Sequence, residues 1–211
     1  MKALLQSILE REAEAVRRIP LSDGYEAAMD LIVEHVQRRH GKLVCAGIGK
    51  AGQIAMNIAT TFSSTGTPAV FLHPCEAQHG DLGVLQPDDV LLLVSNSGKT
   101  REILELIDLV RTLYDGLPLV VITGCPDSPL GRAADVCLAT GHPDEVCALG
   151  MTPTTSTTVM TVIGDLLVVG TMTKIGFTLD EYAKRHHGGY LGTTARRKMQ
   201  TESTEQTPTD H

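Results

Sequence analysis

The sequence predicts an α/β fold: a five-stranded parallel sheet flanked by helices, arranged as a flavodoxin-like three-layer sandwich. Five short runs are mostly apolar and are separated by segments with helical periodicity; they lie at residues 42–46, 69–72, 90–94, 117–122 and 135–139. Strands that are apolar on both faces are typical of a parallel sheet covered by helices on both sides. A chain of 211 residues is long enough to bury such a core in one domain.

Helical periodicity begins before the first strand. Apolar residues recur at helical spacing over residues 2–19 and 24–40, and Asp23 or Ser22 is suited to cap the second of these helices. Further helices are expected at 53–64, after residue 100, and at 128–134, 157–172 and 178–185. The β-branched residues of segment 157–172 leave its type ambiguous by periodicity, and its length favours a buried helix.

The end of the chain differs in composition from the rest. Residues 193–211 contain six Thr residues and many charges, with only Ala195 and Met199 as apolar side chains. Such a segment cannot bury enough apolar surface to become ordered. We therefore assign residues 1–192 to one domain, with two helices before its core, and residues 193–211 to a disordered polar tail.

The composition excludes several classes of protein. Lys and Arg number 18 against 25 Asp and Glu, which gives a net charge of −7, and aromatic residues make up 3% with no Trp. An acidic chain without basic blocks or stacking side chains is a poor nucleic-acid binder. The longest apolar stretch, residues 159–172, contains Gly164 and Asp165 and is too short and too polar to span a bilayer.

Cysteine usage and the first residues indicate a cytoplasmic protein. The five Cys residues are scattered without a CxxC pair, which indicates reduced thiols rather than disulfides. Residues 1–18 lack the sustained apolar segment of a signal peptide. We therefore expect a cytoplasmic location and no membrane partner.

The loop from Ser95 to Thr100 is the first candidate for a functional site. It reads Ser-Asn-Ser-Gly-Lys-Thr, follows an apolar strand and precedes a helix. Ligands of doubly wound sheets bind at the carboxyl ends of the strands, and the N–H groups of a helix N-terminus attract anions. The hydroxyls of Ser95, Ser97 and Thr100 add donors of little bulk. This pattern favours a phosphate site over the plain alternative, a Ser/Thr-rich cap.

A glycine loop follows the first strand. Gly47, Gly49 and Gly52 match the G-x-G-x-x-G dinucleotide fingerprint between a strand and a helix. The next strand ends near His73 without the Asp or Glu that would hold a ribose hydroxyl, and the spacing of a P-loop is absent. We therefore interpret the loop as a tight strand-to-helix turn, with a dinucleotide site as the lesser alternative.

A short polar segment contains potential zinc ligands. His73, Cys75, Glu76 and His79 lie within seven residues, but no helical or ribbon spacing makes them converge. A polar loop at an active site or interface is therefore the favoured interpretation.

Three further residues each have an ordinary structural explanation. Glu102 suits the positive end of a helix, Glu145 suits a solvated loop, and His186 suits a helix C-terminus. Taken together with Lys50 and the phosphate loop, these groups are suited to proton transfer on a phosphorylated substrate.

These motifs together resemble the sugar isomerase (SIS) domain, and most closely the D-arabinose-5-phosphate isomerases. The resemblance covers residues from about 40 to 192, with shared motifs GIGKAG at 47–52, TFSSTGTP at 61–68, HGDLG at 79–83, SNSG at 95–98 and His-x-Gly-Gly-x-Leu-Gly at 186–192. The phosphate loop is common to SIS proteins, whereas the other stretches are more specific. Lys99 and His187 depart from the family pattern, in which an acid and a proline are usual.

The resemblance implies a function. Family members interconvert D-ribulose 5-phosphate and D-arabinose 5-phosphate in the cytoplasm, without a cofactor, for synthesis of Kdo, an octulosonate of lipopolysaccharide and of some capsules. They are typically homotetramers with active sites at subunit contacts, and many carry a pair of CBS modules. We expect this chain to be a single-domain form whose partners are a phosphosugar and copies of itself.

The resemblance also implies residue roles. The catalytic lysine of the family corresponds to Lys50, its two glutamates to Glu102 and Glu145, and its histidines to His79 and His186. Aldose–ketose isomerisation moves a proton between C1 and C2 through an enediolate, which needs a base and a partner for the oxyanion. We expect Glu145 to be the base, with His186 as the alternative base, and Lys50 to lie near the enediolate oxygen. His186 would otherwise open the sugar ring or shuttle the hydroxyl proton, while Glu102 and His79 orient the sugar.

Contacts with the rest of the substrate follow in the same way. The residues expected to hold the phosphate are Ser95, Asn96, Ser97 and Thr100. The other expected substrate contacts are Gly49, Ser64 and Thr65. No metal is expected to take part, although zinc could inhibit by binding at His79 and Cys75.

Two other functions stay open from the sequence. The chain could isomerise another phosphosugar, such as a hexulose or heptulose phosphate. It could also be a non-catalytic regulator that senses a sugar phosphate, although such regulators need a helix-turn-helix partner.

Overall fold

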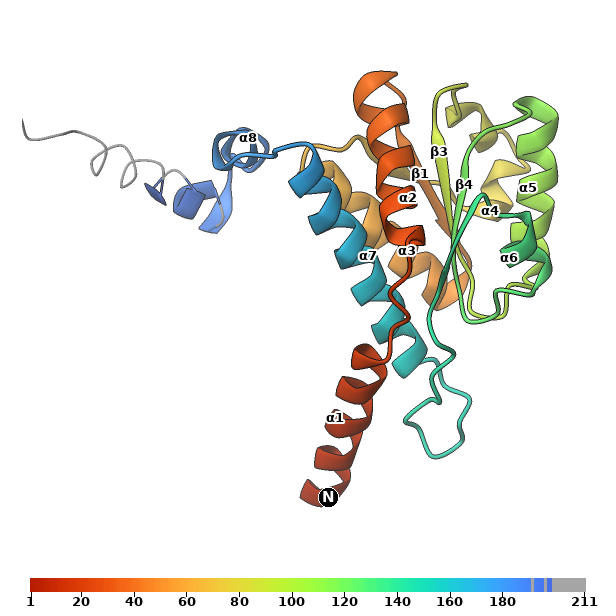
Figure 1. The fold of residues 1–211 in the computed structure, drawn as a ribbon, viewed down its shortest axis with the longest axis vertical. Coiled ribbons are helices and arrows are strands. Elements are labelled where there is room, and N and C mark those ends of the chain that lie inside the picture. The colour runs from red at the N-terminus through yellow and green to blue at the C-terminus, as the bar shows by residue number, and fades with distance from the viewer. Residues whose placement is uncertain (191, 196, 199–211) are drawn as a thin grey trace, which may run out of the picture.

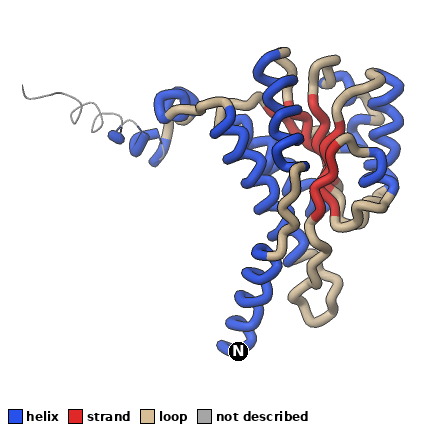
Figure 2. The backbone as a smooth tube through the Cα atoms, in the orientation of Figure 1, coloured by secondary structure: helices blue, strands red, loops and turns tan. Residues whose placement is uncertain are grey.

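A computed structural model describes residues 1–190, 192–195 and 197–198. Five parallel strands form one sheet between two layers of helices (Figures 1 and 2). The strands are β1 (Leu43–Gly47), β2 (Ala69–Phe71), β3 (Val90–Val94), β4 (Leu119–Thr123) and β5 (Val136–Ala139). The helices are α1 (Lys2–Arg17), α2 (Gly24–Ile32), η1 (Val33–Arg38), α3 (Gly49–Ser64), α4 (Pro74–Ala77), η2 (Asp81–Val84), α5 (Arg101–Leu113), α6 (Pro129–Ala133), α7 (Thr155–Lys174) and α8 (Leu179–Arg185). The predicted fold class is confirmed.

The pleat of the strands divides the apolar core into two layers. Leu43 and Cys45 of β1 belong to the cluster formed with α2, α3 and α7, whereas Val44 and Ala46 belong to the cluster formed with α4, α5 and α6. All four side chains are fully buried. Because each face of the sheet is covered, the strands show no alternation of polar and apolar residues, as the sequence pattern indicated.

The strand order determines where a ligand can bind. The order is β2-β1-β3-β4-β5, so the chain moves outward from β1 to β2 and then returns past β1 to β3. After β1 the chain enters α3 on one face of the sheet, and after β3 it enters α5 on the other face. The two loops therefore diverge and leave a crevice at the carboxyl ends of β1 and β3, the topological switch point of the sheet.

The long helix α7 connects the two ends of the molecule. It begins after the loop of residues 140–154 at the carboxyl ends of the strands, and α8 follows its far end (Figure 1). With 20 residues at 1.5 Å each, α7 is about 30 Å long. It is the one helix in the described part that is long and apolar enough to cross a membrane, and half of that stretch is buried in the core. This helix is thus longer than the segment 157–172 predicted from the sequence.

Two other segments differ from the prediction. The second helix continues from α2 into π-helical turns at η1, because the chain there closes i→i+5 bonds such as Arg39 N–H to the Glu34 carbonyl. In the predicted tail, residues 193–195 and 197–198 are helical rather than disordered. Residues 191, 196 and 199–211, which hold the rest of that prediction, lie outside the described part of the chain.

Candidate active site

A cleft of about 510 Å³ opens at the switch point. The loops after β1, β3, β4 and β5 and the start of α7 form its walls. The residues that line it are Ile48, Lys50, Ala51, Val94, Ser95, Asn96, Ser97, Lys99, Thr100, Cys125, His142, Pro153, Ser156, Thr157 and Met160. The cleft therefore brings Lys50 together with the predicted phosphate loop. Its size suits a small polar ligand.

The loop from Ser95 to Thr100 is organised around its own hydroxyls. Ser95 Oγ lies 3.0 Å from Thr100 Oγ1 and accepts a hydrogen bond from the Gly98 N–H at 3.3 Å. Gly98 has φ +61° and lies against Ser128, so a side chain there would strain the backbone and clash. The loop leads into α5, whose first N–H groups have no partner within the helix. This arrangement can bind a phosphate without rebuilding the loop.

Lys50 brings positive charge to this cleft. It is exposed in the first turn of α3 and follows Gly49, whose φ is +61°. The strand and helix meet closely here, since a Cβ on Gly47 would lie 2.8 Å from the Ala51 carbonyl oxygen. The glycine loop is therefore the tight turn that the sequence predicts. Lys99 lines the same cleft and adds a second ammonium group, which also favours an anion.

Glu145 is bound to the first turn of α7. Its carboxylate accepts hydrogen bonds from the N–H and hydroxyl of Thr154, at 2.7 and 2.9 Å, and from the N–H of Ser156 at 3.3 Å and the Ser156 hydroxyl. Burial raises the pKa of Glu145, but these hydrogen bonds outweigh burial and hold the pKa below its usual value. Glu145 thus anchors its loop to the helix.

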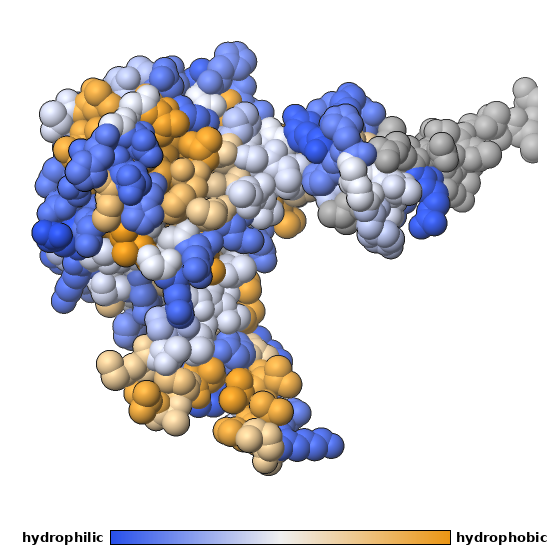
Figure 3. Space-filling model, turned by 180° about the vertical axis from the view of Figure 1, so that it is seen from behind, coloured by the Kyte–Doolittle hydropathy of each residue, from blue (hydrophilic) through white to orange (hydrophobic). Residues whose placement is uncertain are grey.

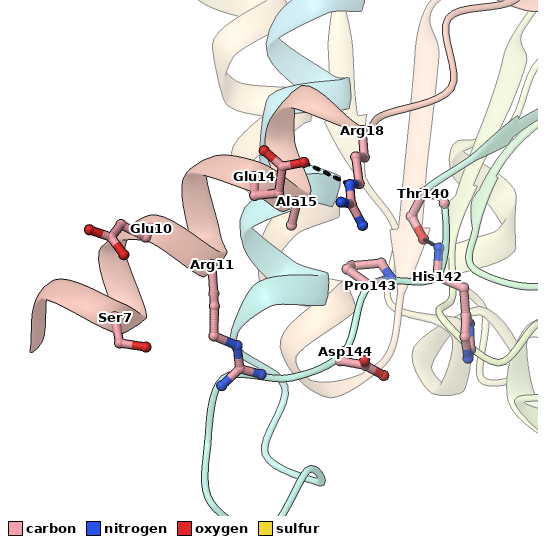
Figure 4. A pocket seen from close by; sticks show the side chains of 11 residues that line it. Ser7, Glu10, Arg11, Glu14, Ala15, Arg18, Thr140, His142, Pro143 and Asp144 are labelled. Atoms are coloured by element: carbon pink, nitrogen blue, oxygen red, sulfur yellow. Dashed lines mark hydrogen bonds and ion pairs between the residues drawn. The ribbon is translucent and has the colours of Figure 1, made fainter. Parts of the chain in front are cut away.

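Helix α1 holds the same loop from the other side. The Arg11 guanidinium donates to the carbonyl oxygen of Glu145 at 2.9 Å and to that of Val146 at 3.4 Å, and Figure 4 shows this side chain reaching the loop. Glu12 Oε1 accepts a hydrogen bond from the Thr155 hydroxyl at 3.0 Å. The backbone around Glu145 is therefore fixed by both α1 and α7. Sequence reasoning missed Arg11 and Glu12, because nothing local indicates a contact over more than 130 positions.

Cys125 and His142 line the cleft but were not predicted from the sequence. Cys125 follows β4, His142 follows β5, and Cys125 Sγ lies 3.9 Å from His142 Nδ1. His142 also borders a second cavity, of about 440 Å³, between α1 and residues 140–144 (Figure 4). Both residues come soon after a strand, so the rule that singled out Ser95 could have found them.

Three predicted residues do not join the cleft of their own chain. Ser64 and Thr65 lie at the end of α3 opposite to Gly49, and their hydroxyls donate to the Thr61 carbonyl oxygen at 2.9 and 2.8 Å. His186 follows α8, beyond the far end of α7 (Figure 1). The lengths of α3 and α7 separate these residues from the carboxyl ends of the strands in the same chain.

Glu102, His79 and Cys75 are absent from the wall of the cleft. Glu102 occupies the first turn of α5, directly after the phosphate loop. His79 is exposed just after α4, and Cys75 lies within α4. Across the described residues, no group of three or more His, Cys, Asp or Glu side chains gathers as a metal site. The zinc expected at His79 and Cys75 therefore has no third protein ligand there.

Comparison with known proteins decides the family. The model of the SIS domain family matches residues 36–170, which include all five strands, the cleft loops and most of α7. The chain belongs to the SIS domain family. This SIS domain is similar to the crystal structure of a Bacteroides fragilis protein described as a phosphosugar isomerase involved in capsule formation. The two are 68% identical with a TM-score of 0.87, over 88% of this chain and 97% of that one.

Two further comparisons concern relatives of this SIS domain. An Escherichia coli CFT073 protein, solved in complex with arabinose 5-phosphate, is 35% identical with a TM-score of 0.80, over 87% of this chain and 96% of that one. Arabinose 5-phosphate isomerase KdsD of Yersinia pestis is 44% identical over 191 residues, which are 90% of this chain and 56% of the relative. The chain thus spans about half the length of the curated relatives it matches. The resemblance noted from the sequence motifs is confirmed.

Proposed function

We propose that this protein is an aldose–ketose isomerase that interconverts D-ribulose 5-phosphate and D-arabinose 5-phosphate. The observation that carries the proposal is the cleft at the switch point, where a preorganised anion loop faces Lys50. The names of the KdsD relatives and the arabinose 5-phosphate complex of a similar structure support the same substrate. No cofactor is needed, because one carbon of the substrate is oxidised as its neighbour is reduced.

In this proposal, the phosphate loop holds the non-reacting end of the sugar. Ser95, Asn96, Ser97 and Thr100 supply that loop, and Gly49 leaves the wall beside Lys50 open. The Lys50 ammonium stabilises the oxyanion that develops when a proton leaves the carbon next to the carbonyl. A base takes that proton and returns it to the neighbouring carbon.

The base is proposed to be Glu145, with His186 as the alternative. Among the described residues, Oε1 of Glu145 accepts a hydrogen bond from Ser156 alone, which leaves a lone pair of this oxygen for the proton. Glu102, at the start of α5, and His79 are proposed to orient the sugar.

A second copy of the chain is proposed to complete the site. Apolar side chains gather at the end of the molecule formed by α1 and the loop before α7 (Figure 3), where Leu4, Leu5, Leu9, Leu149 and Met151 are exposed. A patch of this kind is typical of an interface. A homo-oligomer, as a tetramer, would bury it and could bring His186, Ser64 and Thr65 of one chain to the cleft of another.

The proposed setting is the cytoplasm, where the product would feed Kdo synthesis for lipopolysaccharide or capsule. The capsule-related name of the Bacteroides fragilis relative agrees with the second of these.

The test of the function is a turnover assay with five-, six- and seven-carbon ketose phosphates in heavy water. We expect isomerisation of ribulose 5-phosphate with incorporation of deuterium at carbon. If a hexulose or heptulose phosphate is turned over faster, that sugar is the substrate instead. If a phosphosugar binds without any exchange of hydrogen, the protein is a sugar-phosphate sensor and not an enzyme.

Replacing Ser97 by Ala is expected to raise the KM for the phosphosugar about tenfold and leave kcat nearly unchanged. Ser97 is exposed in the cleft, and its hydroxyl is proposed to donate one hydrogen bond to a phosphate that does not react. Loss of this donor therefore weakens the binding of the substrate and of the transition state equally. Steady-state kinetics measure the effect, with Ser22→Ala, an exposed serine outside the cleft, as the control. An unchanged KM would remove this side chain from the phosphate site.

A further inference from the structure

We propose that His142 is a catalytic residue that carries the hydroxyl proton between O2 and O1 of the phosphosugar. This inference rests on the proposed isomerase function and adds an imidazole from the same chain to its site. No motif in the sequence singled out His142.

Few titratable groups line the cleft. In the described part of the chain these are Lys50, Lys99, Cys125 and His142. Of these side-chain types, only histidine normally exchanges its proton near neutral pH. The Glu145 carboxylate points to the start of α7, and His186 lies beyond the far end of that helix. His142 is therefore the proton carrier that a ligand in this cleft would meet.

The chain holds this imidazole in a defined position. His142 has φ +51°, a left-handed backbone that is uncommon for a residue other than glycine, and strain of this kind concentrates at functional sites. Its N–H donates to the hydroxyl of buried Thr140 at 3.2 Å, which fixes the turn. A Cβ on Gly124 would lie 2.9 Å from His142 Nδ1, so the glycine lets the ring approach the end of β4.

The ring lies close to the phosphate loop. Gly124 donates its N–H to the Asn96 carbonyl oxygen at 3.0 Å, so the glycine against which His142 lies is itself bonded to that loop. His142 Nδ1 faces Cys125 Sγ, which leaves Nε2 for a ligand. His142 therefore lines the cleft close to the loop at Ser95–Thr100 that is proposed to hold the phosphate.

The chemistry requires such a group. When the C2 proton leaves the open-chain aldose, the electron pair forms the C1–C2 double bond and O1 gains the charge. The ketose forms only if the O2 proton moves to O1 and a proton is added at C1. His142 can accept the O2 proton at Nε2 and return the same proton to O1, so that it ends unchanged.

Several charged or titratable groups surround the ring, and each of them contributes to the pH dependence of activity. Across the cleft these are Lys50 and Lys99, and on the adjoining strand loop the Cys125 thiol. On the side of the second cavity they are Asp144 from its own loop and Glu10, Arg11, Glu14 and Arg18 from α1 (Figure 4). Glu14 is already paired with Arg18 at 2.8 Å.

The test compares His142→Asn with His40→Asn. Asparagine tolerates the left-handed backbone, and His40 is likewise exposed with φ +62° but lies before β1, at the end of the sheet away from the cleft. We expect His142→Asn to lower kcat about 100-fold with little change in KM, and His40→Asn to leave both unchanged. Near-normal kcat in His142→Asn, or an equal loss in both variants, would overturn the proposal.

Two further readouts separate proton transfer from binding. Carbon-bound hydrogen should still exchange with heavy water in His142→Asn, at a rate that exceeds the rate of isomerisation. The reason is that this variant is impaired only in the transfer of the hydroxyl proton from O2 to O1. Inorganic phosphate should inhibit the variant and the wild type with the same constant. If phosphate binding weakens as much as kcat/KM falls, His142 belongs to the phosphate site and the proposal fails.

The remaining check concerns Cys147, on the loop that carries Glu145. Hydrogen bonds from Thr152 and then from the backbone of Met151 and Leu149 lower the pKa of its thiol to about 7, so this thiol is a second group that can exchange a proton. Cys147→Ser should leave kcat nearly unchanged, and a loss of kcat as large as that in His142→Asn would overturn the assignment. A wild type without isomerase activity would instead remove the proposed function itself.

Discussion

Replacing Glu145 by Gln is expected to lower kcat by about 10²- to 10⁴-fold, the range that a positioned general base contributes. The amide of glutamine cannot take the carbon-bound proton, and its NH₂ group would face the donors of Thr154 and Ser156. Steady-state kinetics and deuterium exchange at carbon measure the loss. Inorganic phosphate should still inhibit, because the loop at Ser95–Thr100 is unchanged. Exchange at the wild-type rate in this variant would move the role of base to His186.

A second variant separates a base from an anchor. Ser156→Ala removes one donor to the Glu145 carboxylate, so the pKa of Glu145 should rise toward its usual value. A general base of this kind acts only when its carboxylate is ionised. When the solution is acidified, a variant with a raised pKa therefore loses activity at a higher pH than the wild type does. The acid limb of kcat/KM should therefore shift upward in Ser156→Ala. Thr157→Val is the control, since Thr157 donates to the Thr154 carbonyl oxygen and not to Glu145. An unshifted limb would leave Glu145 as an anchor only.

The fold was predictable because each of its elements has a local signal. The run Val90–Val94 is apolar at every position, and the sheet buries it on both faces. Segment 157–172 was ambiguous by periodicity, and its length decided correctly for a helix. The end of that helix was not predictable, because Lys174 is fixed by ion pairs to Glu26 and Asp30 of α2, which are distant in the sequence.

The site was predictable only where chemistry follows a strand directly. Ser95 and Lys50 lie one to three residues beyond β3 and β1, so the topology carries them to one cleft. Glu145 and Arg11 meet because a long loop folds back on α1, which no spacing rule foresees. Ser64 and His186 were assigned to the site only because they belong to motifs of the family. In the structure, the lengths of α3 and α7 separate these two residues from the cleft of the same chain.

Mixing two inactive variants is expected to restore activity if the site is shared between chains. Glu145 lies at the start of α7 and His186 follows α8 beyond its end, and α7 alone is about 30 Å long. One chain therefore cannot bring both residues to one cleft without moving α8. Glu145→Gln and His186→Asn should each lose most of their activity as pure proteins. In a symmetric pair that joins one chain of each kind, one of the two clefts has Glu145 and His186 both intact.

Random assembly makes half of the pairs mixed, so coexpressed or co-refolded variants should recover about a quarter of wild-type activity. Glu145→Gln mixed with the double variant Glu145→Gln, His186→Asn is the control and should recover none, since every cleft then lacks the carboxylate. Light scattering during the assay should show an oligomer, as the exposed leucines of α1 predict. An oligomer that recovers no activity would confine each site to one chain, and His142 would then be the imidazole on which proton transfer in that site depends.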